Sequence, residues 1–183
     1  MLVRDAVDRD AGAIAQVHVE TWQVSYRGVV PDGWLDALSV PARAERWRRI
    51  LAAHAGTGQC IVVAETEGGV VGFANAGPHG SVGNDEEAGH PAYEAEFLCL
   101  YVLPASQRQG VGALLMRATA ARLRNAGLKS ASLWCFADGP AVPFYGSLGG
   151  KIVARKAHVV GGKVLGVVCF AWSDLAPLVA PAH

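Results

Sequence analysis

The chain has 183 residues, 51% of them apolar, and its 16 Lys plus Arg balance 16 Asp plus Glu, so its formal net charge is zero. A chain of this length predicts one domain over residues 1–183 that buries about 70% of its unfolded surface, and it excludes the small scaffolds that need disulfides or structural metals. Charged residues make up 17%, below the usual ~25%, and form no Lys/Arg block, which argues against nucleic acid or an anionic membrane as a partner.

Hydrophobic periodicity and turn residues predict strands and helices in alternation along the chain. In chain order we expect a strand at 2–7, a helix capped by Asp8 that runs to Tyr26, a turn at 28–33, a helix after Pro41, a β-hairpin of 60–66 and 70–76, a strand at 95–104, a helix at 110–126, a strand at 130–136, a short helix at 140–148 and a hairpin of 151–160 and 163–172. The second helix carries Arg43, Arg46 and Arg49 largely on one face, which we interpret as solvent-facing.

This order predicts an α/β (α+β) fold built on one mixed sheet rather than on a doubly wound parallel sheet. A strand–helix–strand unit occurs once, at the centre of the chain. The ligand of such a unit is expected beyond the carboxyl end of its first strand, where the N-terminus of the following helix points at it.

The cysteines stand apart in apolar runs, without a CxxC pair or a Cys/His cluster, so we predict buried thiols in a reducing compartment and no metal site. They are Cys60, Cys99, Cys135 and Cys169. Residues 1–10 are too acidic for a signal peptide, and no run of about 18 apolar residues predicts a membrane span. The expected location is therefore the cytoplasm.

A glycine-containing segment, residues 104–113, occupies the expected ligand position. Gly110 and Gly112 permit close approach to the backbone, and the unpaired N–H groups of the first helical turn attract an anion such as phosphate. The segment lacks the Gly-Lys-Ser/Thr of a Walker loop, and Leu115 stands where a dinucleotide motif has its third glycine, so nucleotide sites are disfavoured. A helix start that is merely softened by glycine is the alternative interpretation.

Two stretches together resemble the GCN5-related N-acetyltransferase (GNAT) superfamily. AEFLCLYVLPASQRQGVGALLM is similar to its central motif, with the Q/R-x-x-G-x-G/A signature at Gln107, Gly110 and Gly112. DGPAVPFYGSLGG is similar to its N-x-x-A-x-x-F-Y-x-x-x-G-F segment, with Phe144 and Tyr145 in place. The opening HVETWQVSYRGVVPDGWLDALSVPARAERW also looks like the first two helices of many bacterial members. The resemblance covers most of the chain and implies a GNAT-like fold.

The resemblance implies acetyl-CoA as the acetyl donor, with no metal. Backbone amides from Gln109 to Ala113 would hold the pyrophosphate, and main-chain groups at Leu100 and Val102 would pair with pantetheine like an extra strand. The further residues of this implied cofactor site are Tyr101, Gln107, Arg108, Gly110, Val111, Gly112, Asp138 and Phe144. Asp138 replaces the family's usual asparagine and loses its amide donor, while Gly150 replaces an aromatic residue and loses its packing.

The implied reaction is direct acetyl transfer to an amine, with the thiolate of CoA leaving. An alkyl ammonium with a pKa near ~10 is mostly protonated at neutral pH, so the reaction needs a proton acceptor. Glu96 stands fourteen residues before Gly110, where several members place a strand glutamate as general base; the alternatives are a solvated carboxylate at the start of the strand and a water-mediated route. Tyr145 matches the tyrosine that often protonates the departing thiolate. Its alternative is a core aromatic beside Phe144, although neighbouring helix residues are not both expected to point inward.

Acceptor specificity in this family comes from the first two helices and from the loop before the central strand. His18, Trp22 and Tyr26 form one helical stripe at i, i+4 and i+8 that either lines the acceptor pocket or packs as core. Residues 84–96 contain five carboxylates and no Lys or Arg, namely Asp85, Glu86, Glu87, Glu94 and Glu96. This field would attract a cationic acceptor, and solvated loop charge explains it equally well. Glu94 is expected on the strand face of Glu96, as a substrate contact.

We therefore predict an acetyl-CoA-dependent N-acetyltransferase that acts in a ternary complex on a primary amine, of a small molecule rather than of a protein N-terminus or lysine. A non-catalytic acyl-CoA-binding or regulatory module and a nucleotide-binding protein are the alternatives. The apolar tail at 175–179 suits a homodimer interface, and it suits an ordinary core as well.

Overall fold

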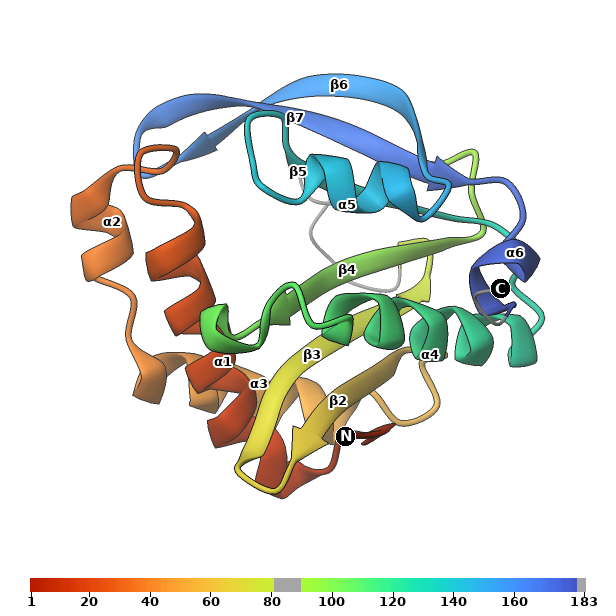
Figure 1. Ribbon diagram of the computed structural model, residues 1–183, viewed down its shortest axis with the longest axis horizontal. Helices are drawn as coiled ribbons and strands as arrows, with labels where there is room; N and C mark the ends of the chain where they lie inside the picture. Colours follow the sequence, from red (N-terminus) through yellow and green to blue (C-terminus); the bar gives the residue numbers. More distant parts are fainter. Residues whose placement is uncertain (81–89, 181–183) are drawn as a thin grey trace.

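A computed structural model describes residues 1–80 and 90–180, and it contains one seven-stranded sheet with helices on both faces (Figure 1). The elements follow in the order β1 (Leu2–Asp5), η1 (Asp8–Asp10), α1 (Ala11–Ser25), α2 (Asp32–Asp36), α3 (Val40–Ala53), β2 (Cys60–Thr66), β3 (Gly69–Pro78), β4 (Ala95–Val102), η2 (Pro104–Ser106), α4 (Val111–Asn125), β5 (Ala131–Phe136), α5 (Val142–Ser147), β6 (Lys151–Val160), β7 (Lys163–Trp172) and α6 (Ala176–Val179). The predicted order of strands and main helices is confirmed, and the short helices α2 and α6 are additional.

The sheet order is β1-β2-β3-β4-β5-β7-β6, with antiparallel neighbours everywhere except between β4 and β5. This arrangement confirms the predicted mixed α/β class. It also places the strand–helix–strand unit of β4, α4 and β5 at the centre of the sheet, as expected.

Alternate residues of β2 face opposite sides of the sheet, which decides where the helices lie. Ile61 and Val63 pack in one core cluster with residues of α1 and α3 such as Ile14. Val62 and Ala64 pack in another cluster with residues of α4. Helix α4 therefore covers one face of β2–β4, and α1 with α3 covers the other face (Figure 1).

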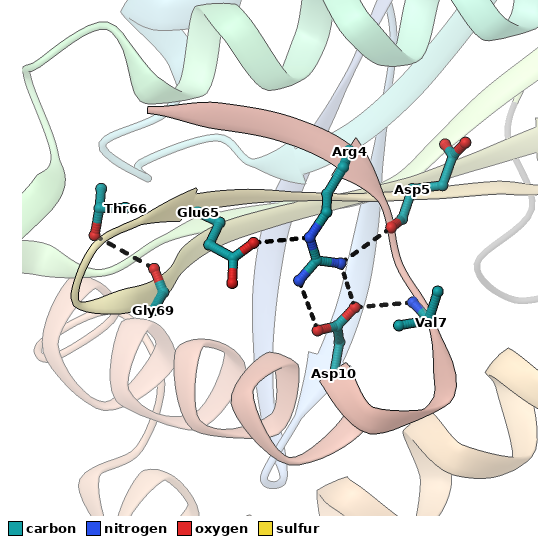
Figure 2. Close-up of polar contacts among 7 residues, drawn as sticks. All are labelled: Arg4, Asp5, Val7, Asp10, Glu65, Thr66 and Gly69. Carbon is teal, nitrogen blue, oxygen red and sulfur yellow. Dashed lines mark hydrogen bonds and ion pairs between the residues drawn. The ribbon is translucent and has the colours of Figure 1, made fainter.

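Arg4 ties strand β1 to strand β2 and to the turn before α1 (Figure 2). Its Nε donates to Glu65 at 2.8 Å, while Nη1 and Nη2 donate to the two carboxylate oxygens of Asp10 at 2.7 and 2.9 Å. The Asp10 carboxylate also accepts the Val7 N–H at 2.8 Å. Hydrogen bonds from Arg4 lower the pKa of Asp10, because they stabilise the charged carboxylate.

The predicted helix cap at Asp8 is wrong. Asp8 opens the short turn η1, and α1 begins at Ala11, after Asp10 as its N-cap residue.

The C-terminal tail belongs to the core. Leu175 is fully buried and Leu178 is 4% exposed, and both pack in the cluster that contains Met116 and Leu123 of α4. These two leucines therefore support the core interpretation of the tail, and the homodimer stays a prediction. Across residues 1–80 and 90–180, none of the helices has the length and apolar character needed to cross a membrane.

Candidate active site

The sheet opens between β4 and β5. Their parallel pairing is limited to Ala95 with Ala131 and Glu96 with Ser132. Beyond Glu96 the two strands diverge, while β5 stays paired with β7 along its whole length. The remaining part of β4 therefore presents a free backbone edge toward an open wedge, at the position that the sequence predicts for a cofactor.

The register of β4 decides which backbone groups face the wedge. The Leu103 N–H donates to Val71 on the β3 side at 2.8 Å, so by alternation the main-chain groups of Leu100 and Val102 point the other way. The Val102 carbonyl already accepts the Thr21 hydroxyl at 3.1 Å and the Gln107 amide at 3.0 Å. The groups of Leu100 and the Val102 N–H are thus the ones left for a ligand.

A bulge in β4 lies next to the opening. Asn75 of β3 opposes Cys99, whereas the next residue, Ala76, opposes Phe97, so Leu98 is the extra residue of the bulge. Bulges bend a strand and redirect its side chains, and they are common beside active sites.

The start of α4 has unpaired backbone amides at the position where the sequence predicts an anion site. Gly110 is the N-cap and has φ +82°, a left-handed conformation that favours glycine. The Leu114 N–H donates to the Gly110 carbonyl at 3.0 Å, so the amides of residues 111–113 precede the hydrogen-bond ladder of the helix. Arg108 in the preceding turn also has a positive φ of 61°. These amides and the helix dipole favour a bound anion.

Gln107 of the signature and the nearby Gln109 brace this loop. Gln107 donates its side-chain amide to Val102 O, and its backbone N–H donates to Pro104 O at 3.3 Å. The Gln109 side chain donates to Ala105 O at 2.9 Å. The Gln107 side chain therefore holds the loop against the end of β4 and occupies the Val102 carbonyl, which is then not available to a ligand.

Phe144 lies against the start of α4. A Cβ built on Gly112 would stand 3.1 Å from Phe144 Cζ, so the glycine allows the ring to approach the helix closely. Val111 is buried beneath the same turn, and Ala113 is half-buried. Phe144 therefore packs beside the amides that the sequence assigns to the cofactor, which fits a supporting role there.

Phe144 and Tyr145 both pack inward, so the expectation that neighbouring residues of this helix diverge is wrong. The six-residue helix α5 packs into the core beside β7 and the start of α4, which gives each ring a contact. Tyr145 is 6% exposed and contacts Phe170 and Trp172 with ring centroids 5.7 and 6.4 Å away. Burial raises the pKa of Tyr145 well above its usual value, so the phenol stays protonated.

A cavity of about 790 Å³ extends from this wedge to the face covered by α1 and α3. Glu96 and Tyr145 both line it. Glu96 is 2% exposed, so the interpretation as a solvated carboxylate at the start of the strand is wrong. Asn75 also lines the cavity, and although the residue is 4% exposed its Oδ1 accepts no hydrogen bond within residues 1–80 and 90–180. Sequence reasoning missed Asn75, because an isolated Asn in an apolar hairpin strand gives no signal.

Glu94 is not brought to the cavity, which corrects its expected role as a substrate contact. It lies exposed before β4, where its carboxylate accepts the backbone N–H groups of Lys129 and Ser130. It therefore fixes the turn between α4 and β5. The other acidic residues of this segment, 85–87, lie outside the described residues.

The stripe of His18, Trp22 and Tyr26 both lines the cavity and packs as an aromatic cluster. His18 stacks on Tyr101 with ring centroids 4.7 Å apart, and Trp22 contacts Tyr26 at 4.9 Å. Burial first, and then the charges of two nearby arginines, lower the pKa of His18 to about 3. Burial raises the pKa of Tyr26 to about 12. The stripe is therefore uncharged near neutral pH.

Arginine, lysine and histidine side chains that the sequence analysis does not assign to the site line the same cavity. Arg43 and Arg46 come from α3. Arg43 is half-buried, which corrects its interpretation as solvent-facing, whereas Arg46 is exposed, as predicted, and borders the cavity. Lys156 and His158 come from β6 on the opposite wall. The Lys156 Nζ lies 4.5 Å above the centre of the Trp134 ring.

The two departures from the family pattern have different structural settings. Asp138 lies exposed just beyond β5 and outside the cavity lining, so its cofactor contact stays a prediction. A Cβ on Gly150 would stand 2.7 Å from Trp172 Cζ2. The Trp172 ring therefore occupies the space that a side chain at position 150 would need.

Comparison with known proteins decides the family. Residues 17–149 match the family model of the acetyltransferase (GNAT) family. The chain belongs to this family. It is 31% identical over 177 residues to the uncharacterized N-acetyltransferase YuaI of Bacillus subtilis, a match that covers 96% of this chain and 95% of YuaI. The protein is thus a GNAT N-acetyltransferase.

Solved GNAT structures share the fold. YncA of Salmonella typhimurium, solved with its cofactor acetyl-CoA, aligns over 100% of this chain and 98% of its own, with a TM-score of 0.71 and 22% identity. The PaiA N-acetyltransferase of Thermoplasma acidophilum, in complex with coenzyme A, aligns over 91% of this chain and 96% of its own, with a TM-score of 0.68 and 15% identity. At these identities the likeness concerns the fold.

The cysteines only partly follow their predicted burial. Cys169 is buried, while Cys60, Cys99 and Cys135 are half-buried, and the last two line the cavity. Burial raises the pKa of Cys135 to about 12, so this thiol stays protonated. Over the described ranges 1–80 and 90–180, no three His, Cys, Asp or Glu side chains gather in a metal-binding group.

Proposed function

We propose that this protein transfers the acetyl group of acetyl-CoA directly to the primary amine of a small molecule. The observation that carries the proposal is the cavity of about 790 Å³, because it connects the free edge of β4 at Leu100 with Glu96, Tyr145 and the aromatic wall of α1. Pockets of about 300 to 1,000 Å³ are typical of small-molecule sites. The cavity therefore has the size and the chemistry to hold a thioester arm and a small acceptor together.

The residues at the start of α4 fit the diphosphate of acetyl-CoA. The amides of 111–113 stand ahead of the helix ladder, and Gly112 lets the Phe144 ring pack directly against this turn. The free main-chain groups of Leu100 fit an extended pantetheine, which would complete β4 as an additional strand. YncA and PaiA are described with acetyl-CoA and coenzyme A respectively, which supports the same donor here.

Two side chains supply the proton chemistry. When bound, acetyl-CoA provides the thioester carbonyl that the amine attacks. The Glu96 carboxylate, buried in the cavity wall, accepts a proton from the substrate ammonium and so frees its lone pair. Tyr145 holds a proton on its phenolic oxygen at neutral pH, since burial raises its pKa, and it donates this proton to the departing thiolate. The second proton of the attacking nitrogen, released as the amide forms, returns to the Tyr145 oxygen.

A coupled assay tests the proposal. Thiol release from acetyl-CoA is followed with a panel of small amines and with peptides that carry a free N-terminus or lysine, beside calorimetry of acetyl-CoA binding. Turnover with a small amine and a slower reaction with every peptide are expected. Tight binding without turnover on any amine would instead identify a non-catalytic acyl-CoA module, and faster peptide turnover would identify a protein acetyltransferase. A larger thermal shift with ATP or NAD than with acetyl-CoA would contradict the donor assignment.

A further inference from the structure

The charges in the cavity describe the acceptor more closely, on the basis of the proposed function. We infer that the acceptor amine carries an anionic group, a carboxylate or a phosphonate, which Arg43, Arg46 and Lys156 bind at the outer part of the cavity while the amine lies at Glu96. Within the described part of the chain, these four are the Lys, Arg, Asp and Glu residues of the lining. They supply three positive charges against one negative charge, in a protein of zero net charge.

The two arginines are set into the wall by helix α3. Arg43 and Arg46 lie three residues apart, so they project from one side of the helix. Both act electrostatically on the buried His18 ring of α1 and disfavour its protonation, which shows that their charges reach the interior of the site. Arg49 on the same helix is exposed and lies outside the lining. Arg46 is exposed as well but belongs to the lining, and Arg43 is half-buried, so these two arginines border the cavity from its rim while Arg49 does not.

Lys156 approaches from the other side. Strand β6 pairs with β7 at the far edge of the sheet, and Lys156 and residues 158–160 of this strand line the cavity. The Lys156 ammonium lies over the Trp134 ring at 4.5 Å, which fixes its position at the wall. The cations of the lining thus come from two elements, α3 and β6.

These cations are separate from the expected pyrophosphate site. Helices α1 and α3 pack on the face of the sheet opposite α4, as the alternation of Ile61 and Val62 shows. The amides of 111–113 lie at the start of α4, on the other face. The arginines of α3 are therefore placed for the acceptor side of the reaction.

The deep part of the cavity has the opposite character. Glu96 is 2% exposed and Asn75 is 4% exposed, and both line the cavity. The Asn75 Oδ1 accepts no hydrogen bond from residues 1–80 or 90–180, and a carbonyl oxygen left buried in this way costs free energy that a ligand N–H would recover. A carboxylate and a carbonyl acceptor at depth suit an ammonium. The outer cations suit a carboxylate, because Arg binds planar anions through paired N–H groups.

This polarity selects among amines. It favours an amino acid or amino-acid-like molecule, whose ammonium and anion are separated by a few bonds. It disfavours polyamines and aminoglycosides, whose additional ammonium groups would meet Arg43, Arg46 and Lys156. Residues 85–87, on which the expectation of a cationic acceptor partly rests, lie outside the described residues, so that expectation stays a prediction.

Matched substrate pairs test the inference. Rates of thiol release are measured for amino acids and for the amines that remain after removal of the carboxylate, for example phenylalanine with phenethylamine and lysine with cadaverine. Aminoalkylphosphonates of equal length distinguish a preference for carboxylate from a preference for phosphonate. We expect kcat/KM to be about tenfold to 100-fold higher for the anionic member of the best pair, because hydrogen bonds to charged groups contribute that much.

Variants then locate the anion. Arg46→Gln and Lys156→Gln should each lower kcat/KM about tenfold or more for the acceptor that carries the anionic group. For the matched amine that lacks this group, kcat/KM should stay within about twofold of wild type. Arg49→Gln is the matched control and should change neither, and melting curves verify that all variants fold. Equal losses for both partners, or a wild-type preference for the neutral or polycationic amines, would overturn the inference while leaving the acetyltransferase proposal intact. An absence of turnover with all amines would instead contradict the proposed function.

Discussion

Trp47 donates its indole N–H to Nδ1 of His18 over 3.3 Å and so joins helix α3 to helix α1 beside the cavity. Because an indole only donates, Nδ1 is the acceptor, and the proton of the neutral ring lies on Nε2. Burial, followed by the charges of Arg43 and Arg46, lowers the pKa of this histidine to about 3. The ring therefore presents a defined tautomer to the site across the neutral pH range.

This neutral histidine predicts an acid-sensitive fold. The unfolded chain binds a proton at His18 near pH 6.5, whereas the folded ring stays neutral down to about pH 3, so the free energy of unfolding falls as the pH drops between these values. His18→Gln keeps an acceptor for Trp47 and should flatten this part of the curve. Urea unfolding at several pH values measures it, with His54→Gln as the control outside the cavity. Parallel curves for wild type and His18→Gln would refute the assignment.

Glu96→Gln should separate catalysis from binding. A glutamine cannot accept the ammonium proton, so kcat should fall about 10²-fold to 10⁴-fold. The Kd of acetyl-CoA, measured by calorimetry, should stay unchanged. Glu94→Gln is the matched control, because this exposed carboxylate holds the backbone amides of Lys129 and Ser130 and lies outside the cavity. A normal kcat in Glu96→Gln would leave a water chain as the route for the proton.

Tyr145→Phe removes the phenolic proton but keeps the ring that packs on Phe170. We expect kcat to fall about tenfold or more, since protonation of the leaving thiolate is lost, while the melting temperature and the Kd of acetyl-CoA stay close to wild type. Tyr93→Phe, outside the cavity lining, serves as the control. Unchanged turnover, or a loss of activity that is explained by unfolding, would show that Tyr145 acts as a core aromatic residue and not as the proton donor.

Gly112→Ala should weaken cofactor binding through Phe144. The added Cβ would lie 3.1 Å from Phe144 Cζ, so either the ring or the first turn of α4 must move, and the amides of 111–113 move with that turn. We expect the Kd of acetyl-CoA to rise about tenfold, which is a loss of about 1.4 kcal/mol. The double variant Gly112→Ala/Phe144→Leu removes the contacting ring and should recover part of the affinity. No change in the Kd of the single variant would show that the amides do not hold the ligand.

Asp10→Asn should destabilise the fold by about 1 to 3 kcal/mol at neutral pH, because it breaks a charge-assisted pair with Arg4. The pKa of Asp10 is lowered from 3.8 by that pair, so the stabilisation is present above pH 3.8 and is lost as the pH falls through the lower folded pKa. Denaturant unfolding of wild type and variant should therefore converge in acid. Asp8→Asn, at an exposed position, is the control. A constant difference at all pH values would show that the charge is not responsible.

The strands and the long helices were predictable because their periods are strong. Strands β6 and β7 fall at the predicted residues, since Gly161 and Gly162 divide two continuous runs. Helix α2 was missed because its five residues, which include Gly33, are too few to show a helical period. The turn expected at 28–33 therefore overlaps the first two residues of this helix, Asp32 and Gly33.

The cavity was only partly predictable. Glu96 and Tyr145 stand in motifs, so their types and spacing identify them. Arg43 and Arg46 look like any charged helix face, because a single helix does not reveal which element closes over it. Lys156 reaches the site only through the pairing of β6 with β7 and of β7 with β5, and that long-range register is not encoded in any local pattern.

The early end of the β4–β5 ladder has a consequence for aggregation through strand edges. An unpaired strand edge usually recruits further chains and seeds aggregates, which proteins prevent with charges, prolines or coverings. Here the unsatisfied stretch after Glu96 is recessed in a notch whose far wall is β5, so a flat sheet from a neighbour has no room to dock. A single extended ligand can pair with the backbone of β4 there, and the same backbone is not presented as an open strand edge to other proteins.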